Sequence, residues 1–347
     1  MKRTVFSLLA ALLLLSCGRQ PADTPIPRTT PERSGVDTTG FSLLFNDVWG
    51  THACDEIHSL VVLKGGKLVY DRYAVGEDPD QLRVMWSASK TFTSAAVGFA
   101  VQEGLLTVED RVIDFFKEEM AAAGGLAARP DSAWLAGMTV KNLLTMSAFS
   151  HDDIDRCIQN DTVNWARVVL ASELEFEPGT KFRYNSMDTY LLSAIVSNLT
   201  GQTVSAYLTP RLFEPLGIRR WHWDLSPQGC NTGGWGLYLT TESFAKMGQF
   251  YLQKGMWNGK QLLDPQWIID STSPQIYQKG VPVEDERGMG YGYQIWCDTH
   301  NAFRLDGAHG QHCIVMPEKA AVVAYHSNSR HTMDIIKYVW ERIWPAL

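Results

Sequence analysis

The sequence lacks the short motifs that most often mark a metal site. It contains no Cys-x-x-Cys and no His-Glu-x-x-His, and its nine histidines are scattered along the chain. Closely spaced Cys and His side chains are what a protein needs to hold zinc. No metal site and no cofactor are therefore predicted. The Gly-x-Ser-x-Gly motif of α/β-hydrolases is also missing, which disfavours that class of enzyme.

Positive charge is scarce as well. The 31 Lys and Arg residues are outnumbered by 38 Asp and Glu residues, so the formal net charge is −7. Nucleic-acid binding needs a basic patch or a basic run interleaved with aromatic residues, and the sequence contains neither. Nucleic acid is therefore not expected as a partner.

The apolar run at the N-terminus, from Val5 to Leu15, is too short to span a membrane. It follows the basic Lys2 and Arg3, and this pattern predicts a secretory signal over residues 1–16. Its end, Leu-Leu-Ser-Cys, resembles the lipobox of bacterial lipoproteins, in which the signal is cut before a cysteine that receives lipid. The resemblance implies a lipid on Cys17 that contacts the membrane. It also implies a location in the bacterial cell envelope, periplasmic or associated with the outer membrane. An uncleaved or conventionally cleaved signal is the alternative.

Removing residues 1–16 from the 347-residue chain leaves 331 and, with the loss of two basic residues, shifts the formal charge from −7 to −9. That length can bury a large core, in one domain or two intimate ones. Residues 17–40 are polar and contain four prolines, which is typical of an extended tether between membrane and domain. If Cys17 carries lipid, five of the six cysteines remain, so at least one thiol is unpaired.

Patterns typical of β-strands lie near both ends of the chain, and helical patterns lie between them. Strands are predicted at 57–63, 67–73, 291–297, 312–316 and 320–326. Helices are predicted at 41–50, 139–146, 164–174, 187–199, 204–213, 241–253 and 332–343. This order predicts an α/β (α+β) fold. Residues 41–86 and 285–347 would form an antiparallel sheet flanked by helices, and residues 87–284 a mostly helical region.

Residues 85–91, Met-Trp-Ser-Ala-Ser-Lys-Thr, open a further predicted helix that ends at Gly104. Ser87 and Lys90 are three residues apart, so a helix places both side chains on one face. The first turn of a helix also favours negative charge. A buried lysine loses its proton more readily and can then act as a base toward a serine hydroxyl. The pair predicts a nucleophile and its base, although Ser87 as a simple helix N-cap is the alternative.

Two more segments carry candidate chemistry. Residues 178–186 form a predicted turn, a short extended piece and a helix start, which would hold Tyr184 and Ser186 toward a shared cleft. A phenol near ammonium groups has a lowered pKa and can move protons, although a tyrosine that only packs is the alternative. Residues 305–311 precede a predicted strand, and an N–H there could face an acyl oxygen together with the N–H of Ser87.

Several histidines and glycines are weaker candidates. A structural or surface role is the more common one for His309 and His312. The segment 305–311 could be an ordinary glycine turn, and the glycine-rich segment 232–237 could be a pocket wall or only a loop.

Taken in order, Ser87-x-x-Lys90, Tyr184-Asn185-Ser186 and Gly307-Ala308 resemble the three motifs of the serine β-lactamase and penicillin-binding-protein superfamily, in particular its class C-like branch. The similarity extends over residues 41–345 and includes 139–147, 176–180 and 233–237. It implies Ser87 as the acyl-accepting nucleophile and Lys90 and Tyr184 as the proton-transfer pair. It further implies an oxyanion hole made by the N–H groups of Ser87 and Ala308, and substrate contacts from Trp86, Ser186, Trp235, Gly307 and His309.

The sequence also departs from the class C pattern. That pattern has Tyr-x-Asn and Lys-Thr-Gly where this chain has Tyr-x-Ser and Leu305-Asp306-Gly307. The cation that would pair with a β-lactam carboxylate is thus missing, and Asp306 would repel that carboxylate. Tyr-x-Ser and the segment Gly307 to Gln311 are more similar to 6-aminohexanoate-dimer hydrolase and esterase members. An alignment shifted by three residues, onto Gly310, is the alternative for the third motif.

These motifs predict a serine hydrolase that forms an acyl-enzyme on a small ester, amide or short peptide. A D-alanyl peptidase or weak β-lactamase acting on cell-wall peptides is the alternative within the same class. A non-catalytic lipoprotein that binds peptidoglycan fragments is the alternative from another class. The motifs leave the natural substrate and the oligomeric state open.

Overall fold

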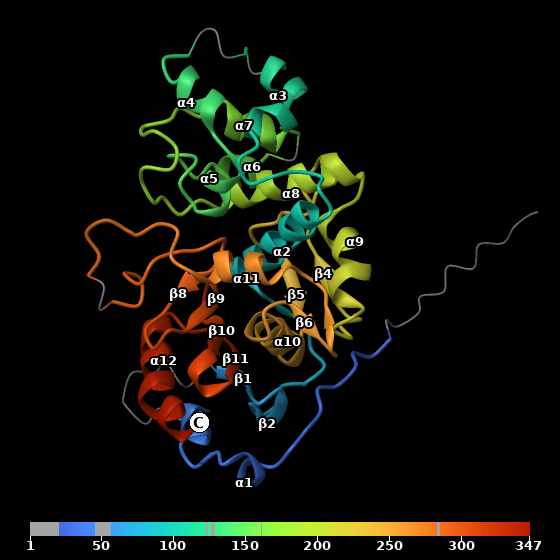
Figure 1. The fold of residues 1–347 in the computed structure, drawn as a ribbon, viewed down its shortest axis with the longest axis vertical. Coiled ribbons are helices and arrows are strands. Elements are labelled where there is room, and N and C mark those ends of the chain that lie inside the picture. Colours follow the sequence, from blue (N-terminus) through green and yellow to red (C-terminus); the bar gives the residue numbers. More distant parts are fainter. Residues whose placement is uncertain (1–20, 46–56, 123, 126–128, 161, 283–284) are drawn as a thin grey trace, which may run out of the picture.

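A computed structural model describes residues 21–45, 57–122, 124–125, 129–160, 162–282 and 285–347 (Figure 1). The predicted signal peptide at 1–16, the predicted lipid site at Cys17 and the second half of the helix expected at 41–50 lie outside these residues. The chain forms a sheet region built from its two ends and a helical region packed above it. The predicted fold class is thereby confirmed.

The main sheet is antiparallel throughout, with the strand order β2-β1-β11-β10-β9-β8. The N-terminal hairpin lies beside the C-terminal strand β11, where Leu60 pairs with Tyr325. Gly65 and Gly66, both with positive φ, form the hairpin turn. The strand bounds are β1 Ile57–Lys64, β2 Lys67–Tyr73, β8 Trp296–Cys297, β9 Phe303–Gly307, β10 Gln311–Met316 and β11 Ala321–Ser327.

Both faces of the sheet are covered, because successive side chains of a strand point to opposite faces. Val61 and Leu63 of β1 face one apolar core, whereas Leu60 and Val62 face another. The helix α10 (Thr241–Leu252) covers the first face and α12 (Thr332–Tyr338) the second. α10 therefore belongs to the sheet region, although it lies inside the stretch that the sequence predicts as a separate helical region.

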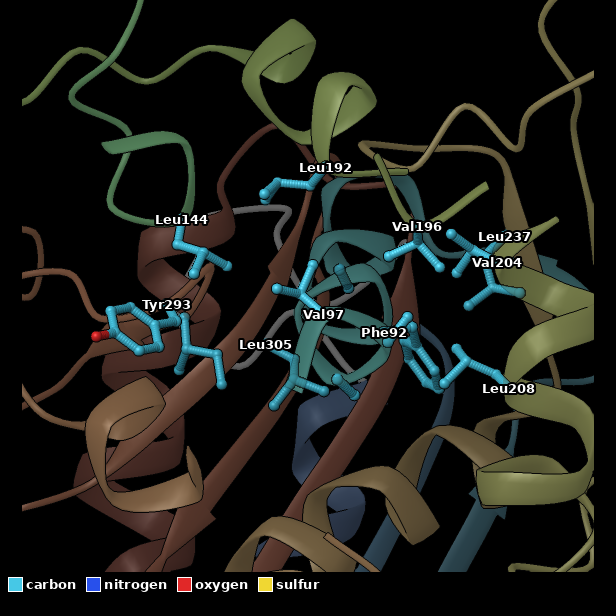
Figure 2. Packing of buried hydrophobic residues seen from close by; sticks show 14 of the residues in the cluster. Phe92, Val97, Leu144, Leu192, Val196, Val204, Leu208, Leu237, Tyr293 and Leu305 are labelled. Atoms are coloured by element: carbon cyan, nitrogen blue, oxygen red, sulfur yellow. The ribbon is translucent and has the colours of Figure 1, made fainter. Parts of the chain in front are cut away.

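The helix α2 (Ser89–Gln102) lies between the sheet and the helical region and is buried on all sides from Ser89 to Ala100. Figure 2 shows Phe92 and Val97 of α2 among apolar side chains from both regions. In the sequence, Phe92, Ala95, Ala96 and Phe99 have the spacing of one apolar helical stripe. Small residues fill the remaining faces, and Gly98 lies directly against the indole of Trp267.

The remaining helices include all of those predicted between residues 139 and 213, together with several short ones that the sequence did not reveal. Their bounds are α1 Pro31–Ser34, α3 Lys117–Ala122, α4 Ser132–Gly137, α5 Val140–Leu144, α6 Ile154–Ile158, α7 Trp165–Leu170, α8 Ser186–Thr200, α9 Val204–Leu208 and α11 Pro265–Thr272. Short strands complete the fold: β3 Arg83–Val84, β4 His222–Trp223, β5 Leu237–Leu239, β6 Met256–Trp257 and β7 Lys260–Gln261.

Two strand predictions need correction. The predicted strand 291–297 is a strand only at Trp296–Cys297, because a turn closed by the hydrogen bond from Gly292 N to Ile295 O interrupts the segment. Residues 303–307, which the sequence places partly in a turn before a strand, form the strand β9 and pair with β10.

The tether prediction is wrong for residues 21–40, since this segment packs along the domain. The backbone N–H of Thr24 donates to Gly217 O, and the N–H of Thr29 donates to Leu68 O. The Asp23 carboxylate accepts from the backbone of residues 219 and 220, and Ile26 is only 5% exposed. Proline keeps this segment extended, but its other residues supply the donors and the apolar side chain that dock it.

In the part of the chain that the structure describes, no helix is both long enough and apolar enough to cross a bilayer. The described cysteines, Cys157, Cys230, Cys297 and Cys313, are all free thiols.

The contact between Gly98 and Trp267 allows a test of the packing around α2. A Cβ at residue 98 would lie 2.6 Å from the Trp267 indole. Gly98→Ala should therefore destabilise the protein by about 1–3 kcal/mol through overpacking, despite the better helix propensity of alanine. Urea unfolding measures this change. Gly137→Ala in α4 is the control, because no atom lies within 4 Å of its Cβ position. A Gly98→Ala protein as stable as wild type would contradict the described packing.

Candidate active site

Ser87 lies on a short 3₁₀ turn, Trp86–Ala88, between the strand β3 and the helix α2. The α-helix begins at Ser89, two residues later than the sequence predicts. The turn is fixed on both sides, because Met85 N donates to Leu237 O and the Ser89 hydroxyl donates to Trp86 O. Trp86 adopts a positive φ of 47°, which is unusual for a bulky residue. This local strain is held by the surrounding hydrogen bonds and orients the serine that follows.

The Lys90 side chain is 1% exposed and is surrounded by three oxygen atoms. Its Nζ lies 3.1 Å from Ser87 Oγ, 3.2 Å from Ser186 Oγ and 2.7 Å from the carbonyl oxygen of Gly234. Burial lowers the pKa of Lys90 to about 7, although the charges of three nearby aspartates act in the opposite direction. A neutral Lys90 amine has two N–H donors, which match Gly234 and Ser186, and one lone pair free to face Ser87.

The half-buried Tyr184 ring lies between aromatic residues and next to Lys90. It stacks on Trp296 with a centroid distance of 6.0 Å, and Lys90 Nζ lies 5.0 Å from the centre of the Tyr184 ring. Burial raises the pKa of Tyr184 well above its usual range, and a hydrogen bond with the Ser87 side chain reverses only part of that shift. The expected lowering of this pKa is therefore wrong, because desolvation outweighs any cation and the nearby aspartates add negative charge. Tyr184 is a neutral phenol that holds its proton.

Asn185 fixes the backbone between Tyr184 and Ser186. As the N-cap of α8, its side-chain oxygen accepts from the backbone of Met187 at 2.8 Å and of Asp188 at 3.3 Å. Its amide nitrogen donates to the carbonyls of residues 149 and 151, which ties the cap to a neighbouring loop. The Ser186 N–H donates to the Asp152 carboxylate at 2.9 Å, a contact that no sequence pattern indicates.

Gly307 and Ala308 lie at the end of β9, next to the turn that holds Ser87. A Cβ on Gly307 would lie 2.2 Å from Met85 O, so only glycine lets β9 approach that turn. Ala308 lines the same cavity as Ser87, and no described residue accepts its N–H. Gly310 instead lies against Ser327. The geometry thus favours Gly307 over Gly310 as the third motif.

The other candidate residues are more dispersed. Trp86 and His309 contact each other edge to face, at 5.6 Å, and line an adjacent cavity of about 310 Å³. His312 is 1% exposed and bonds to the Tyr325 hydroxyl, so its role is structural. Trp235 stacks on Trp165 and is not among the residues that line the cavity of Ser87. The segment that carries Trp235 contributes the Gly234 carbonyl to the site, whereas the Trp235 indole lies outside the cavity.

Comparison with known proteins shows which family the chain belongs to. The sequence profile of the Beta-lactamase family, described as "Beta-lactamase", matches residues 58–347. The chain belongs to the Beta-lactamase family.

Two curated relatives and one solved structure illustrate the similarity. The "6-aminohexanoate-dimer hydrolase" of Paenarthrobacter ureafaciens is 22% identical over 76% of this chain and 71% of that protein. The "Putative D-alanyl-D-alanine carboxypeptidase" of Escherichia coli (strain K12) is 25% identical over 63% of this chain, but the match spans only 55% of that protein. The structure titled "Putative 6-aminohexanoate-dimer hydrolase from Bacillus anthracis" superimposes with a TM-score of 0.72, at 20% identity, over 93% of this chain and 87% of the other.

The predicted membership of the β-lactamase and penicillin-binding-protein superfamily is confirmed, and this family consists in general of serine hydrolases. Leu305 of β9 is fully buried in the core. Its neighbours in the strand, Arg304 and Asp306, face the cavity of Ser87 instead.

That cavity has a volume of about 370 Å³. It is lined by Ser87, Phe182, Tyr184, Gln278, Arg287, Trp296, Arg304, Asp306, Ala308, Thr332 and Met333. The sequence did not point to the aromatic wall or to either arginine, because these residues come from segments that only the folded chain brings together. Among the described residues, no group of three or more His, Cys, Asp or Glu side chains could hold a metal ion.

Asp306 does not present a free negative charge to this cavity. Arg304 Nε donates to its carboxylate at 2.7 Å, and His312 Nε2 lies 3.4 Å away. Burial raises the pKa of Asp306, but the charges of His312 and Arg304 outweigh burial and hold the pKa well below its usual range. Arg304 is also paired with the buried Asp298.

The pKa of Lys90 predicts how reactivity at Ser87 depends on pH. Below about pH 7 Lys90 is mostly protonated and cannot accept the serine proton. The rate constant for labelling by a fluorophosphonate should therefore rise about tenfold per pH unit below pH 7 and become constant above about pH 8. Labelling reactions quenched at successive times, between pH 5 and 9, measure this rate constant. Replacing the exposed Lys337 by methionine should leave the profile unchanged. A profile that is flat, or that falls toward high pH, would contradict a lysine base.

Proposed function

We propose that the chain is a serine hydrolase of the Ser-x-x-Lys type, acting through an acyl-enzyme on small esters or amides. The observation that carries the proposal is the position of Lys90 Nζ, 3.1 Å from Ser87 Oγ in a site that lowers the lysine pKa to about 7. A serine becomes a good nucleophile when an adjacent base can take its proton, and this base is partly neutral at physiological pH.

The first half of the reaction forms the acyl-enzyme. Ser87 Oγ attacks the carbonyl carbon while its proton moves to the Lys90 amine. The N–H groups of Ser87 and Ala308 stabilise the oxygen that becomes negative. The bond to the leaving group then breaks, its heteroatom takes the proton of Tyr184, and Lys90 returns a proton to the tyrosine. The high pKa of Tyr184 suits this role, because the phenol is protonated when the leaving group departs.

The second half releases the acid. Water attacks the acyl carbon and gives a proton to the Lys90–Tyr184 pair, and the same two N–H groups hold the oxyanion. The bond between the acyl carbon and Ser87 Oγ breaks, and the serine regains its proton. A cavity of about 370 Å³ fits a small substrate.

The relatives support this choice of reaction. One is described as a hydrolase of the 6-aminohexanoate dimer, a small linear amide, and another as a carboxypeptidase. The chain covers 71% of the former but only about half of the latter, so the small-substrate reaction is the better supported of the two. Leu305 at the position of the family lysine also disfavours a β-lactam or a D-alanyl peptide. The intact set of Ser87, Lys90 and Tyr184 disfavours a role in binding without catalysis.

Labelling with a fluorophosphonate tests the nucleophile. The purified wild-type protein should gain one covalent phosphonyl group, detected by intact mass, because the probe reacts with activated serines. Ser87→Ala should abolish this label, and Ser89→Ala is the matched control, since the Ser89 hydroxyl is bound to Trp86 O and Leu237 N. Equal labelling of wild type and Ser87→Ala would refute the proposal.

The same preparations separate the two candidate reactions. Simple p-nitrophenyl esters should turn over far faster than a chromogenic cephalosporin, because no lysine stands at residue 305 to pair with the cephalosporin carboxylate. A cephalosporin rate equal to or above the ester rate would favour the β-lactamase alternative. A tight ligand with no turnover of either substrate would favour the binding protein.

We also propose that a lipid on Cys17 anchors the enzyme in the cell envelope. The apolar run and Leu-Leu-Ser-Cys at 14–17 support this proposal. Because Asp23 is already docked on the domain, only residues 18–22 would separate the lipid from the folded part. Bacteria expressing the full chain should incorporate a palmitate probe into wild type but not into Cys17→Ser, and the variant should leave the membrane fraction. Equal incorporation would contradict the proposal.

A further inference from the structure

A cavity of about 640 Å³ lies between the N-terminal segment and the helix α10, apart from the site around Ser87. Residues 24–27, the strap, form one of its walls. The other walls come from α10, the turn between β1 and β2, and two further segments: Lys246, Gln249, Gln253, Gly66, residues 214–217 and residues 256–259. None of these residues lines the cavity of Ser87. A ligand bound here would therefore not contact the catalytic groups.

The strap is tied to the domain at both of its ends. Thr24 N donates to Gly217 O at 2.8 Å, and Leu68 N donates to Pro27 O at 2.9 Å. Pro25 and Pro27 have no N–H of their own to bond, so the strap needs few partners between these two ties. It can therefore remain in place as a wall without filling the space beneath it.

Gln249 is the unusual residue of this cavity. It is only 4% exposed, its Oε1 is buried, and neither atom of its side-chain amide has a hydrogen-bond partner among the described residues. A Cβ on Gly66 would lie 3.8 Å from Gln249 Nε2, so the amide lies at the cavity wall. A buried amide without partners destabilises a folded protein. A ligand with complementary groups would remove that cost.

Lys246 lies one helical turn before Gln249, so the two side chains share one face of α10. It is fully buried, and within the described chain its Nζ has a single hydrogen-bond acceptor, Gly217 O at 3.2 Å. An ammonium has three N–H donors, which leaves two for a ligand. Burial lowers the pKa of Lys246, and the negative charges of Asp23 and Glu242 oppose part of this shift.

The two side chains call for a ligand that both donates and accepts hydrogen bonds. Gln249 Oε1 needs a donor, whereas Lys246 Nζ needs acceptors. An amide carries an N–H and a C=O side by side, and thus supplies both. A carboxylate has no donor, and the negative charges of Asp23, Glu242 and the lining residue Glu214 disfavour an anion. The remaining wall is largely apolar and suits an apolar substituent: Pro25, Ile26, Pro27, Pro215, Leu216, Met256 and Trp257.

We propose that this cavity binds a small neutral amide with an apolar substituent, of the size of an N-acylated amino-acid amide. The amide group pairs with Gln249 and Lys246, and the substituent packs against the strap and Trp257. This site goes beyond the function proposed above, because it does not use Ser87. It also joins the strap to α10 through the ligand.

Titration with N-acetyl-L-leucinamide tests the proposal on the purified full chain carrying Ser87→Ala, which cannot hydrolyse the probe. Ligand-observed NMR measures the Kd, which should be on the order of 1 mM for a molecule of this size. N-acetyl-L-leucine has a carboxylate in place of the terminal amide. It should bind about tenfold more weakly, because it offers one donor group fewer and carries a negative charge.

Variants in the same background assign the binding to this cavity. Gln249→Leu keeps a similar volume and should raise the Kd about tenfold, since it removes the hydrogen bonds to the ligand. Its midpoint of urea unfolding should not fall, because in the free protein the amide has no described partner to lose. Lys246→Met should also raise the Kd. Gln266→Leu, at an exposed residue of α11 outside the cavity, is the control and should bind as the parent does.

Four results would overturn the proposal. The first is no binding of the amide, which would show that the cavity holds only water. The second is an unchanged Kd in Gln249→Leu and Lys246→Met, which would place the probe elsewhere. The third is tighter binding of the anionic probe. The fourth is a loss of binding in Gln249→Leu together with a lower urea midpoint, which would show a structural role. Fluorophosphonate labelling of Ser87 is a separate measurement, so failure of the proposed hydrolase would be seen there and not in these titrations.

Discussion

The burial of one amine governs the organisation of this site. Lys90 is enclosed by the 3₁₀ turn before α2, the start of α8 and the segment 232–237, and each contributes one oxygen atom within 3.2 Å of its Nζ. A buried ammonium is costly unless it is well bonded, so the same enclosure that supplies three partners also lowers the lysine pKa toward neutrality. Gly234 permits this arrangement, because a Cβ there would lie 2.8 Å from Ser186 O.

Burial acts in opposite directions on the two groups that move protons. It makes Lys90 easier to deprotonate, and it makes Tyr184 harder to deprotonate. One group is thus suited to accept the serine proton and the other to supply a proton to the leaving group. The carboxylate of Asp306, which lines the same cavity and whose charge acts on both groups, is bound by Arg304 and His312. The cavity therefore combines two groups suited to proton transfer with a carboxylate that already has its partners.

Much of the fold could be predicted because its elements follow local rules. Three local features are visible in the sequence: the glycine pair between β1 and β2, the caps of α8 and α10, and the apolar runs of β10 and β11. The parts that were missed depend on distant partners. Residues 291–297 alternate like a strand, but a turn from Gly292 to Ile295 interrupts them, and Tyr293 N donates to Ser271 O instead of to a neighbouring strand. Residues 21–40 are rich in proline like a tether, but they dock because Gly217 and Leu68 offer acceptors.

By itself the sequence determined which residues have the right chemistry and local spacing. Ser87 and Lys90 are three residues apart, and Tyr184 directly precedes a helix cap. Their candidate roles can therefore be predicted from local geometry. Only the tertiary structure decided which distant groups meet: the Gly234 carbonyl at Lys90, Asp152 at Ser186, and Trp296 against the Tyr184 ring. The physical reason is that pKa values and charge recognition depend on desolvation and on neighbours brought together by folding. Neither desolvation nor the set of spatial neighbours can be read from the order of residues along the chain.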